Sequence, residues 1–288
     1  IVRDLVSSKV DAMSIRIAAV QPRTFSGDDE AKNLDACLDY IDQAADAGAK
    51  FVCLPEMYPG PVHPSIDFDT TALYDKAAER QVYLIRGKRE PAGDQHNVCA
   101  EVIGPDGKSV GLYRRTTPSG PYIYQDLEAW SIDYAPADGL PVFETEFGKI
   151  GVLICSEVYV PELTRVLVLA GAKLIFYPSG GHINELMGTW KIMLQARAIE
   201  NLIYTAACQN MYGVEEGVGM ICGPEGVLAE DGGEAVIIAD LDMEHLQWLR
   251  DQDEKLEIPK KYRVVPGTLR WRRPDLYGPL VAPPSIAQ

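Results

Sequence analysis

The stretch KIGVLICSEVYVPELTRVLVLAGAKLIFY, residues 149–177, decides the fold class. It opens on an apolar run at 149–155 that is rich in β-branched residues, which predicts a buried strand. Residues 161–170 are predicted to form a helix, with Pro161 in the position that proline favours at a helix N-terminus. The run 174–177 predicts another strand. A strand, a helix and a strand in this order indicate an α/β protein.

The same alternation runs through the rest of the chain. The predicted strands lie at 15–21, 51–54, 82–86, 98–103, 109–115, 203–209 and 235–241, and the predicted helices at 28–50, 71–80 and 184–201. Turn residues at 104–107 and 223–226 each separate two strand-like runs, and this pattern is typical of a hairpin. Because hairpins pair antiparallel strands, the sheets are expected to be mixed rather than wholly parallel.

A single domain is expected over residues 13–288, because no Gly/Ser-rich or Pro-rich linker separates the two halves. Its C-terminal part, from about Arg270, is a proline-rich tail. Residues 1–12 are interpreted as an N-terminal extension or a non-native remnant and take no part in the fold prediction.

Composition excludes several classes of protein. The chain has 288 residues, of which 47% are hydrophobic and 24% charged, as in a globular protein with a sizeable core. Its net charge of −15 disfavours nucleic acid and anionic membrane surfaces as partners. No apolar run approaches the roughly 20 residues that span a bilayer. Six cysteines without a CxxC pair indicate a reducing compartment, so a cytoplasmic location is expected.

Cys155 is the sharpest candidate for a reactive side chain. It ends the apolar run 149–155, and Pro161 and Glu162 follow as the first turn of a helix. A thiol at such a turn is expected to be exposed and close to helix N–H groups, which favour the nucleophilic thiolate. The alternative interpretation is that Cys155 is one of several buried cysteines that pack as small hydrophobic residues.

A thiol nucleophile also needs a base. The four histidines, His63, His96, His182 and His245, stand in loop-like contexts without an orienting partner that the sequence reveals. A carboxylate is therefore the better candidate. Glu56 follows the short strand 51–54, and open α/β sheets bind ligands at the carboxyl ends of their strands.

An ordered set of motifs gives the chain a family resemblance. The motifs are Ala19-Val20-Gln21, Leu54-Pro55-Glu56, Leu112-Tyr113-Arg114-Arg115, Gly148-Lys149-Ile150-Gly151 leading to Cys155, Pro161-Glu162 with Arg165, Arg197-Ala198-Ile199-Glu200-Asn201, Asn210 and Arg272-Arg273-Pro274-Asp275-Leu276-Tyr277. With these motifs the chain resembles the nitrilase superfamily, the carbon–nitrogen hydrolases, from about Ile15 to Leu280. The resemblance implies a four-layer αββα sandwich with two mixed sheets. It also implies a Glu-Lys-Cys triad, no metal or organic cofactor, and a homodimer or higher homo-oligomer.

The resemblance assigns roles to individual residues. Glu56 falls on the general base of the family and Cys155 on its nucleophile, while the backbone N–H of Ser156 is expected to help bind an oxyanion. Glu128 is similar in its surroundings to a second active-site carboxylate of carbamoylases. Residues in neighbouring loops, expected to contact substrate, are Tyr58, His63, Tyr122, Tyr124 and His182.

Two residues depart from the family pattern. Arg115 stands where the family has its triad lysine, and an arginine can stabilise an oxyanion but does not readily share a proton. Ser156 stands where nitrile-cleaving members tend to have tryptophan and many amidases have tyrosine. The sequence therefore predicts a thiol hydrolase acting on a small amide or N-carbamoyl compound. The alternatives are a nitrile-cleaving enzyme, or a catalytically weak or inactive member that serves as a binding or assembly subunit.

Overall fold

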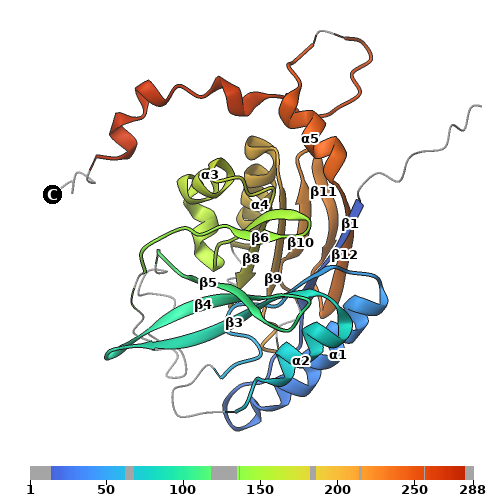
Figure 1. Cartoon of the computed structure of the whole chain (residues 1–288), viewed down its shortest axis with the longest axis vertical. Helices are drawn as coiled ribbons and strands as arrows, with labels where there is room; N and C mark the ends of the chain where they lie inside the picture. Colours follow the sequence, from blue (N-terminus) through green and yellow to red (C-terminus); the bar gives the residue numbers. More distant parts are fainter. Residues whose placement is uncertain are drawn as a thin grey trace, which may run out of the picture.

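A computed structural model describes residues 14–61, 68–117, 135, 137–181, 186–213, 216–255 and 257–282. Within these residues the strands form two six-stranded sheets packed face to face, with helices on both outer sides (Figure 1). The αββα sandwich expected from the family resemblance is confirmed. No helix in the described part of the chain is long and apolar enough to cross a membrane.

The first sheet contains five strands of the N-terminal half and one strand from near the C-terminus. In sheet order they are β12 (Ala235–Asp242), β1 (Ser14–Gln21), β2 (Phe51–Cys53), β3 (Tyr83–Ala92), β4 (Gln95–Ile103) and β5 (Ser109–Arg114). Strands β1, β2 and β3 are parallel, and the remaining pairs are antiparallel. The predicted hairpin at 104–107 joins β4 to β5, so the sheet is mixed, as expected.

The second sheet has a similar arrangement. Its order is β11 (Gly226–Asp231), β10 (Gly219–Gly223), β9 (Tyr204–Gln209), β8 (Leu174–Ser179), β7 (Gly148–Val152) and β6 (Phe143–Thr145). Strands β7, β8 and β9 are parallel, while hairpins add β6 and the β10–β11 pair as antiparallel edges.

Four helices cover the outer faces of the sheets. Helices α1 (Lys32–Asp46) and α2 (Ala72–Arg80) lie on the first sheet, and α3 (Pro161–Leu169) and α4 (Met187–Asn201) on the second (Figure 1). Helix α1 buries a stripe at three- and four-residue steps, formed by Cys37, Ile41 and Ala44. A further helix, α5 (Met243–Asp251), follows β12, and the C-terminal tail contains short 3-10 turns.

The main core lies between the two sheets. The inner faces of β1, β2 and β3 meet those of β7, β8 and β9 there, and the rings of Phe51 and Phe176 lie 5.8 Å apart across the interface. A second cluster fills the space between the first sheet and helices α1 and α2. Because both sheets are covered on two sides, their central strands read in the sequence as continuous apolar runs.

Some elements differ from the sequence prediction in extent and pairing. Strands β3 and β4 extend through 83–92 and 95–103, because they pair with each other in a long hairpin. The first helix begins at Lys32 instead of residue 28, because residues 27–29 form a 3-10 turn. The strand before Cys155 ends at Val152.

Candidate active site

Three candidate residues converge at one edge of the sandwich. Strands β2 and β5 of the first sheet run in the same direction, so Glu56 and Arg115, which follow them, lie at the same edge. The Arg115 guanidinium donates from Nη1 to Glu56 Oε1 at 2.8 Å. Cys155 follows β7 of the second sheet and faces Glu56 closely enough for each group to shift the pKa of the other.

Glu56 is a buried carboxylate with 3% of its surface exposed. Its Oε2 atom has no well-formed hydrogen bond in the described part of the chain. Burial raises the pKa of Glu56 above its ordinary value, and the Arg115 charge, the Cys155 thiol and the Gly180 amide offset this rise only in part. A carboxylate with a raised pKa is a better proton acceptor near neutral pH, which suits a general base.

Arg115 is fully buried, with 0% exposure, and its guanidinium links three segments. Besides the bond to Glu56, Nε donates to the Thr117 carbonyl at 3.0 Å, and Nη2 donates to Ser156 Oγ. The nearby sequence offers three other cations, but each has its own partner outside the site: Lys108 pairs with Asp106, Arg114 with Glu90 and Lys149 with Glu144. Arg115 is therefore the cation that stands beside Glu56.

Cys155 differs from the sequence prediction in its exposure and its ionisation. It opens a 3-10 helix at Cys155–Tyr159, in a left-handed backbone conformation with a φ of 54°. Only 7% of its surface is exposed, and burial, followed by the negative charge of Glu56, raises the pKa of the thiol to about 12. The expectation of an exposed thiol biased towards thiolate is wrong. The resting group is a protonated thiol that needs a base to remove its proton.

The sequence did not single out Glu157, yet this buried carboxylate organises the site. Its Oε1 accepts hydrogen bonds from the Thr116 and Thr117 backbone N–H groups at 2.9 and 3.0 Å, and its Oε2 accepts from the Ile154 N–H at 2.7 Å. The Tyr113 hydroxyl donates to the same carboxylate. Glu157 thus ties the loop after Arg115 to the turn that carries Cys155. A buried charge of this kind persists only with several donors around it.

Two further groups at the ends of β8 and β9 were not predicted to belong to the site, although Asn210 is among the family motifs. The Gly180 amide acts on the pKa values of both Glu56 and Cys155, and a Cβ atom at Gly180 would lie 2.8 Å from Glu56 Oε2. Asn210 donates from Nδ2 to the Glu56 carbonyl at 2.8 Å. The signal that could have found them is their place in the chain, since β7, β8 and β9 are parallel and end at the same edge.

Of the remaining side chains predicted to form the site, the structure describes only Tyr58. Glu128, His63, Tyr122, Tyr124 and His182 lie outside the described residues. Tyr58 is placed elsewhere: it is buried beneath α1, on the outer side of the first sheet, and its hydroxyl donates to the Asn33 carbonyl at 3.1 Å. The described residues contain no group of three or more His, Cys, Asp or Glu side chains that could hold a metal ion.

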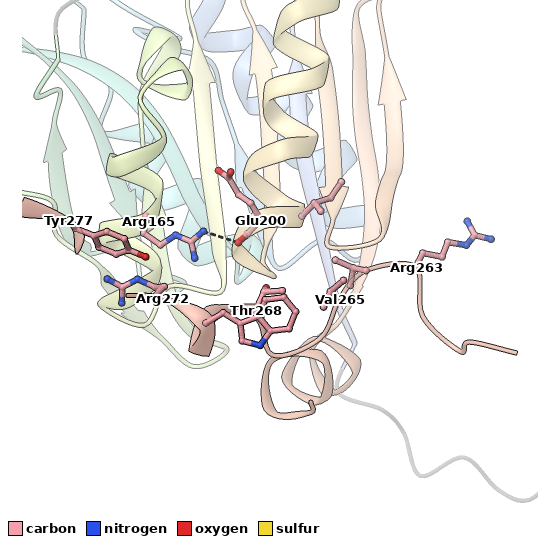
Figure 2. A pocket seen from close by; sticks show the side chains of 10 residues that line it. Arg165, Glu200, Arg263, Val265, Thr268, Arg272 and Tyr277 are labelled. Carbon is pink, nitrogen blue, oxygen red and sulfur yellow. Dashed lines mark hydrogen bonds between the residues drawn. The ribbon is translucent and has the colours of Figure 1, made fainter. Parts of the chain in front are cut away.

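A separate cavity of about 580 Å³ lies between α3, α4 and the C-terminal tail (Figure 2). Arg165, Glu200, Arg272 and Tyr277 line it, and Arg165 donates to the Glu200 carbonyl at 2.9 Å. Arg197 and Glu200, three residues apart on α4, form an ion pair at 2.8 Å. None of Glu56, Arg115 and Cys155 lines this cavity, so it is distinct from the candidate active site.

Comparisons with known proteins identify a matching family and several similar proteins. Residues 16–251 match the family model described as carbon-nitrogen hydrolase. The chain is 31% identical over 272 residues to the omega-amidase NIT2 of Xenopus tropicalis, covering 86% of this chain and 92% of that protein. The human omega-amidase NIT2 is 29% identical over 287 residues, with 92% and 97% covered.

Solved structures extend the similarity. An amidase from Nesterenkonia sp. is 26% identical, with a TM-score of 0.69 over 83% of this chain and 93% of that one. A Glu-to-Gln mutant of the Nesterenkonia sp. AN1 amidase, 25% identical with a TM-score of 0.69 and the same coverage, carries the acetamide moiety of fluoroacetamide at its active site cysteine. Nit3 of Saccharomyces cerevisiae is 24% identical, with a TM-score of 0.70 over 86% and 96% of the two chains, and shares the fold.

The thiols provide a first test of the site. Cys155 has 7% exposure, whereas the other five cysteines have 0%. Brief treatment of the native protein with iodoacetamide should therefore label Cys155 first, as read by peptide mass spectrometry. In denaturant, all six thiols should react alike. Preferential labelling of Cys53 or Cys208 in the native protein would contradict the placement of Cys155.

The close approach at Gly180 provides a second test. In Gly180→Ala, the new Cβ would meet Glu56 Oε2 at 2.8 Å and push against a carboxylate held by Arg115. Overpacking of this kind should lower the free energy of unfolding by about 1–3 kcal/mol, measured by urea denaturation. The control is Gly188→Ala in α4, where the new Cβ meets nothing within 4 Å. Equal stability of the two variants would show that Glu56 moves freely.

Proposed function

Because this chain belongs to the carbon–nitrogen hydrolase family of the nitrilase superfamily, we propose that it hydrolyses the carbon–nitrogen bond of a small amide or N-carbamoyl compound through a thioester on Cys155. The observation that carries the proposal is the buried contact between the Glu56 carboxylate and the Cys155 thiol, with Arg115 bound to Glu56. Amide chemistry is supported by relatives that are named amidases.

The first step depends on the raised pKa values of Glu56 and Cys155. The thiol of Cys155 and the carboxylate of Glu56 both resist charge because they are buried. The thiol therefore stays protonated until the substrate carbonyl is in place. Glu56 then takes its proton as the sulfur attacks, and the proton is later given to the departing ammonia or amine. Water, activated by the same carboxylate, hydrolyses the thioester.

The tetrahedral intermediate carries a negative charge on oxygen. The backbone N–H of Ser156 and the amide of Gly180 are the donors proposed to bind it, since both stand next to Cys155 in the chain or in space. The fixed charge of Arg115, which is bound to Glu56, also stabilises the oxyanion. Because a guanidinium does not readily give up a proton, Glu56 carries every proton transfer in this scheme.

Glu56→Gln tests the proposal. The variant loses the proton acceptor, so kcat on a panel of small amides and N-carbamoyl compounds should fall by about 100- to 10,000-fold. The Gln carbonyl can still accept from Arg115 but does not neutralise it, so the melting temperature should also drop. Release of ammonia or amine is the measurement. A parent protein that releases none from any compound supports the inactive-subunit alternative, and a variant within about tenfold of the parent moves the base elsewhere.

We further propose that two copies associate through the α3–α4 face and the tail. Large apolar side chains are exposed on the α3–α4 face and on the tail. Helices α3 and α4 pack against each other, so these exposed side chains are not needed for packing within one chain. These residues are Val166, Leu169, Ile192, Ile199, Trp271, Leu276, Leu280 and Val281. In Figure 1 the tail, in red, runs along the α3 side of the molecule.

The six free thiols support activity in a reducing compartment such as the cytoplasm.

Mutation of the apolar face tests this assembly. The parent protein should elute with the mass of two or more chains in size-exclusion chromatography with light scattering. The double variant Val166→Asp with Ile192→Asp should shift towards one chain, because it buries charge in the proposed interface. Val227→Asp, at an exposed position on the edge strand β11, is the matched control and should leave the mass unchanged.

A further inference from the structure

We propose that the side chain of Ser156 is a positioning residue, which holds the Arg115 guanidinium in register with Glu56 and Cys155. The proposal rests on the proposed function and adds to it. In the mechanism above Ser156 contributes a backbone N–H, a role that any residue could fill. The hydrogen bond from Arg115 Nη2 to Ser156 Oγ gives the side chain a second role.

The geometry of the guanidinium explains why the contact with Ser156 affects the other contacts of Arg115. The group is planar, and its donors point in fixed directions. Nη1 is directed at Glu56 Oε1 and Nε at the Thr117 carbonyl, so the direction of Nη2 is set as well. That direction ends on Ser156 Oγ, at the first turn after Cys155. Arg115 has 0% exposure, so water is a poor substitute for any of these acceptors.

Without the hydroxyl, Nη2 would lose the contact that ties it to the turn after Cys155, and the guanidinium could turn about the Cδ–Nε bond. Rotation about the Cδ–Nε bond moves Nη1 at the same time, because both nitrogens belong to one rigid plane. The contact with Glu56 and the charge beside Cys155 would then both change. Ser156 therefore acts on the proton acceptor and the nucleophile through Arg115.

The two departures from the family pattern are therefore structurally linked. Position 115 has arginine where the family has lysine, and position 156 has serine where tyrosine or tryptophan is common. The structure places these two side chains in contact. A lysine ammonium offers its donors from a single point and can reach Glu56 without a second anchor, whereas a guanidinium has a further nitrogen to satisfy. A small hydroxyl at 156 supplies an acceptor for this nitrogen.

A double-mutant cycle tests the pair, using Ser156→Ala, Arg115→Lys and the two combined. Ser156→Ala should lower kcat by about 10- to 100-fold, the range for a hydrogen bond to a charged group, while KM stays within about twofold. Ser156→Thr keeps the hydroxyl and should recover most of the loss. In the Arg115→Lys background, Ser156→Ala should have no further effect. The control is Ser26→Ala, because Ser26 is exposed and caps no helix with its side chain.

The iodoacetamide labelling rate of Cys155 supplies a readout that does not require turnover. The Arg115 charge favours the thiolate of Cys155. Ser156→Ala should therefore slow the labelling, Ser156→Thr should restore it, and the effect should vanish in the Arg115→Lys background. If the parent hydrolyses no amide, the proposed function fails while this cycle still decides the pair. Unchanged labelling and kcat in Ser156→Ala, or additive effects in the double variant, would overturn the proposal.

Discussion

Burial of the Arg115 guanidinium against the Glu56 carboxylate is the constraint on which the rest of the site depends. Removing two charges from water costs several kcal/mol for each ion, and mutual attraction repays this only when the remaining donors and acceptors are satisfied. For the guanidinium, the surrounding structure supplies the Thr117 carbonyl and the Ser156 hydroxyl as acceptors. The Asn210 amide holds the Glu56 backbone, while Glu56 Oε2 has no well-formed hydrogen bond in the described part of the chain. Glu157 holds the neighbouring loop in a similar way. It is fully buried, and its carboxylate accepts hydrogen bonds from both sides of the site.

Each of the two sheets supplies part of the candidate active site. The first sheet supplies the carboxylate and the cation from strands that run in one direction, and the second supplies the thiol, the Gly180 amide and Asn210 from its own parallel strands. The relative position of base and nucleophile is therefore set by the packing between the sheets, where Phe51 and Phe176 meet and Cys53 lies 3.8 Å from Cys208. Because interiors of this kind are close-packed, a change in volume there moves one half of the site against the other.

The sequence predicted the fold class and the residues that converge, because both depend on local signals. Strand and helix periodicity shows in short windows, and Glu56, Arg115 and Cys155 lie in recognisable motifs at strand ends. Burial and ionisation were not accessible in this way. The raised pKa of Cys155 comes from burial and from Glu56, which is distant in the sequence, and the partners of Glu157 come from the distant segment 113–117 as well as from Ile154. Tyr58 lies two residues after Glu56 in the chain, but its side chain belongs to the core between the first sheet and helices α1 and α2.

The pairing of β12 with β1 has a consequence for the order in which the chain acquires its structure. Ser14 lies opposite Asp242, and the register continues to the pair of Gln21 and Ala235, so the central strands of the first sheet have a free edge until almost the whole chain has left the ribosome. Contacts between such distant residues are slow to form, because a long loop must close before they contribute. The strand before Glu56 neighbours β1, so this part of the sheet is complete only after translation has passed residue 242. A nascent chain stopped before that point exposes an unpaired strand edge, which is a site for aggregation or chaperone binding.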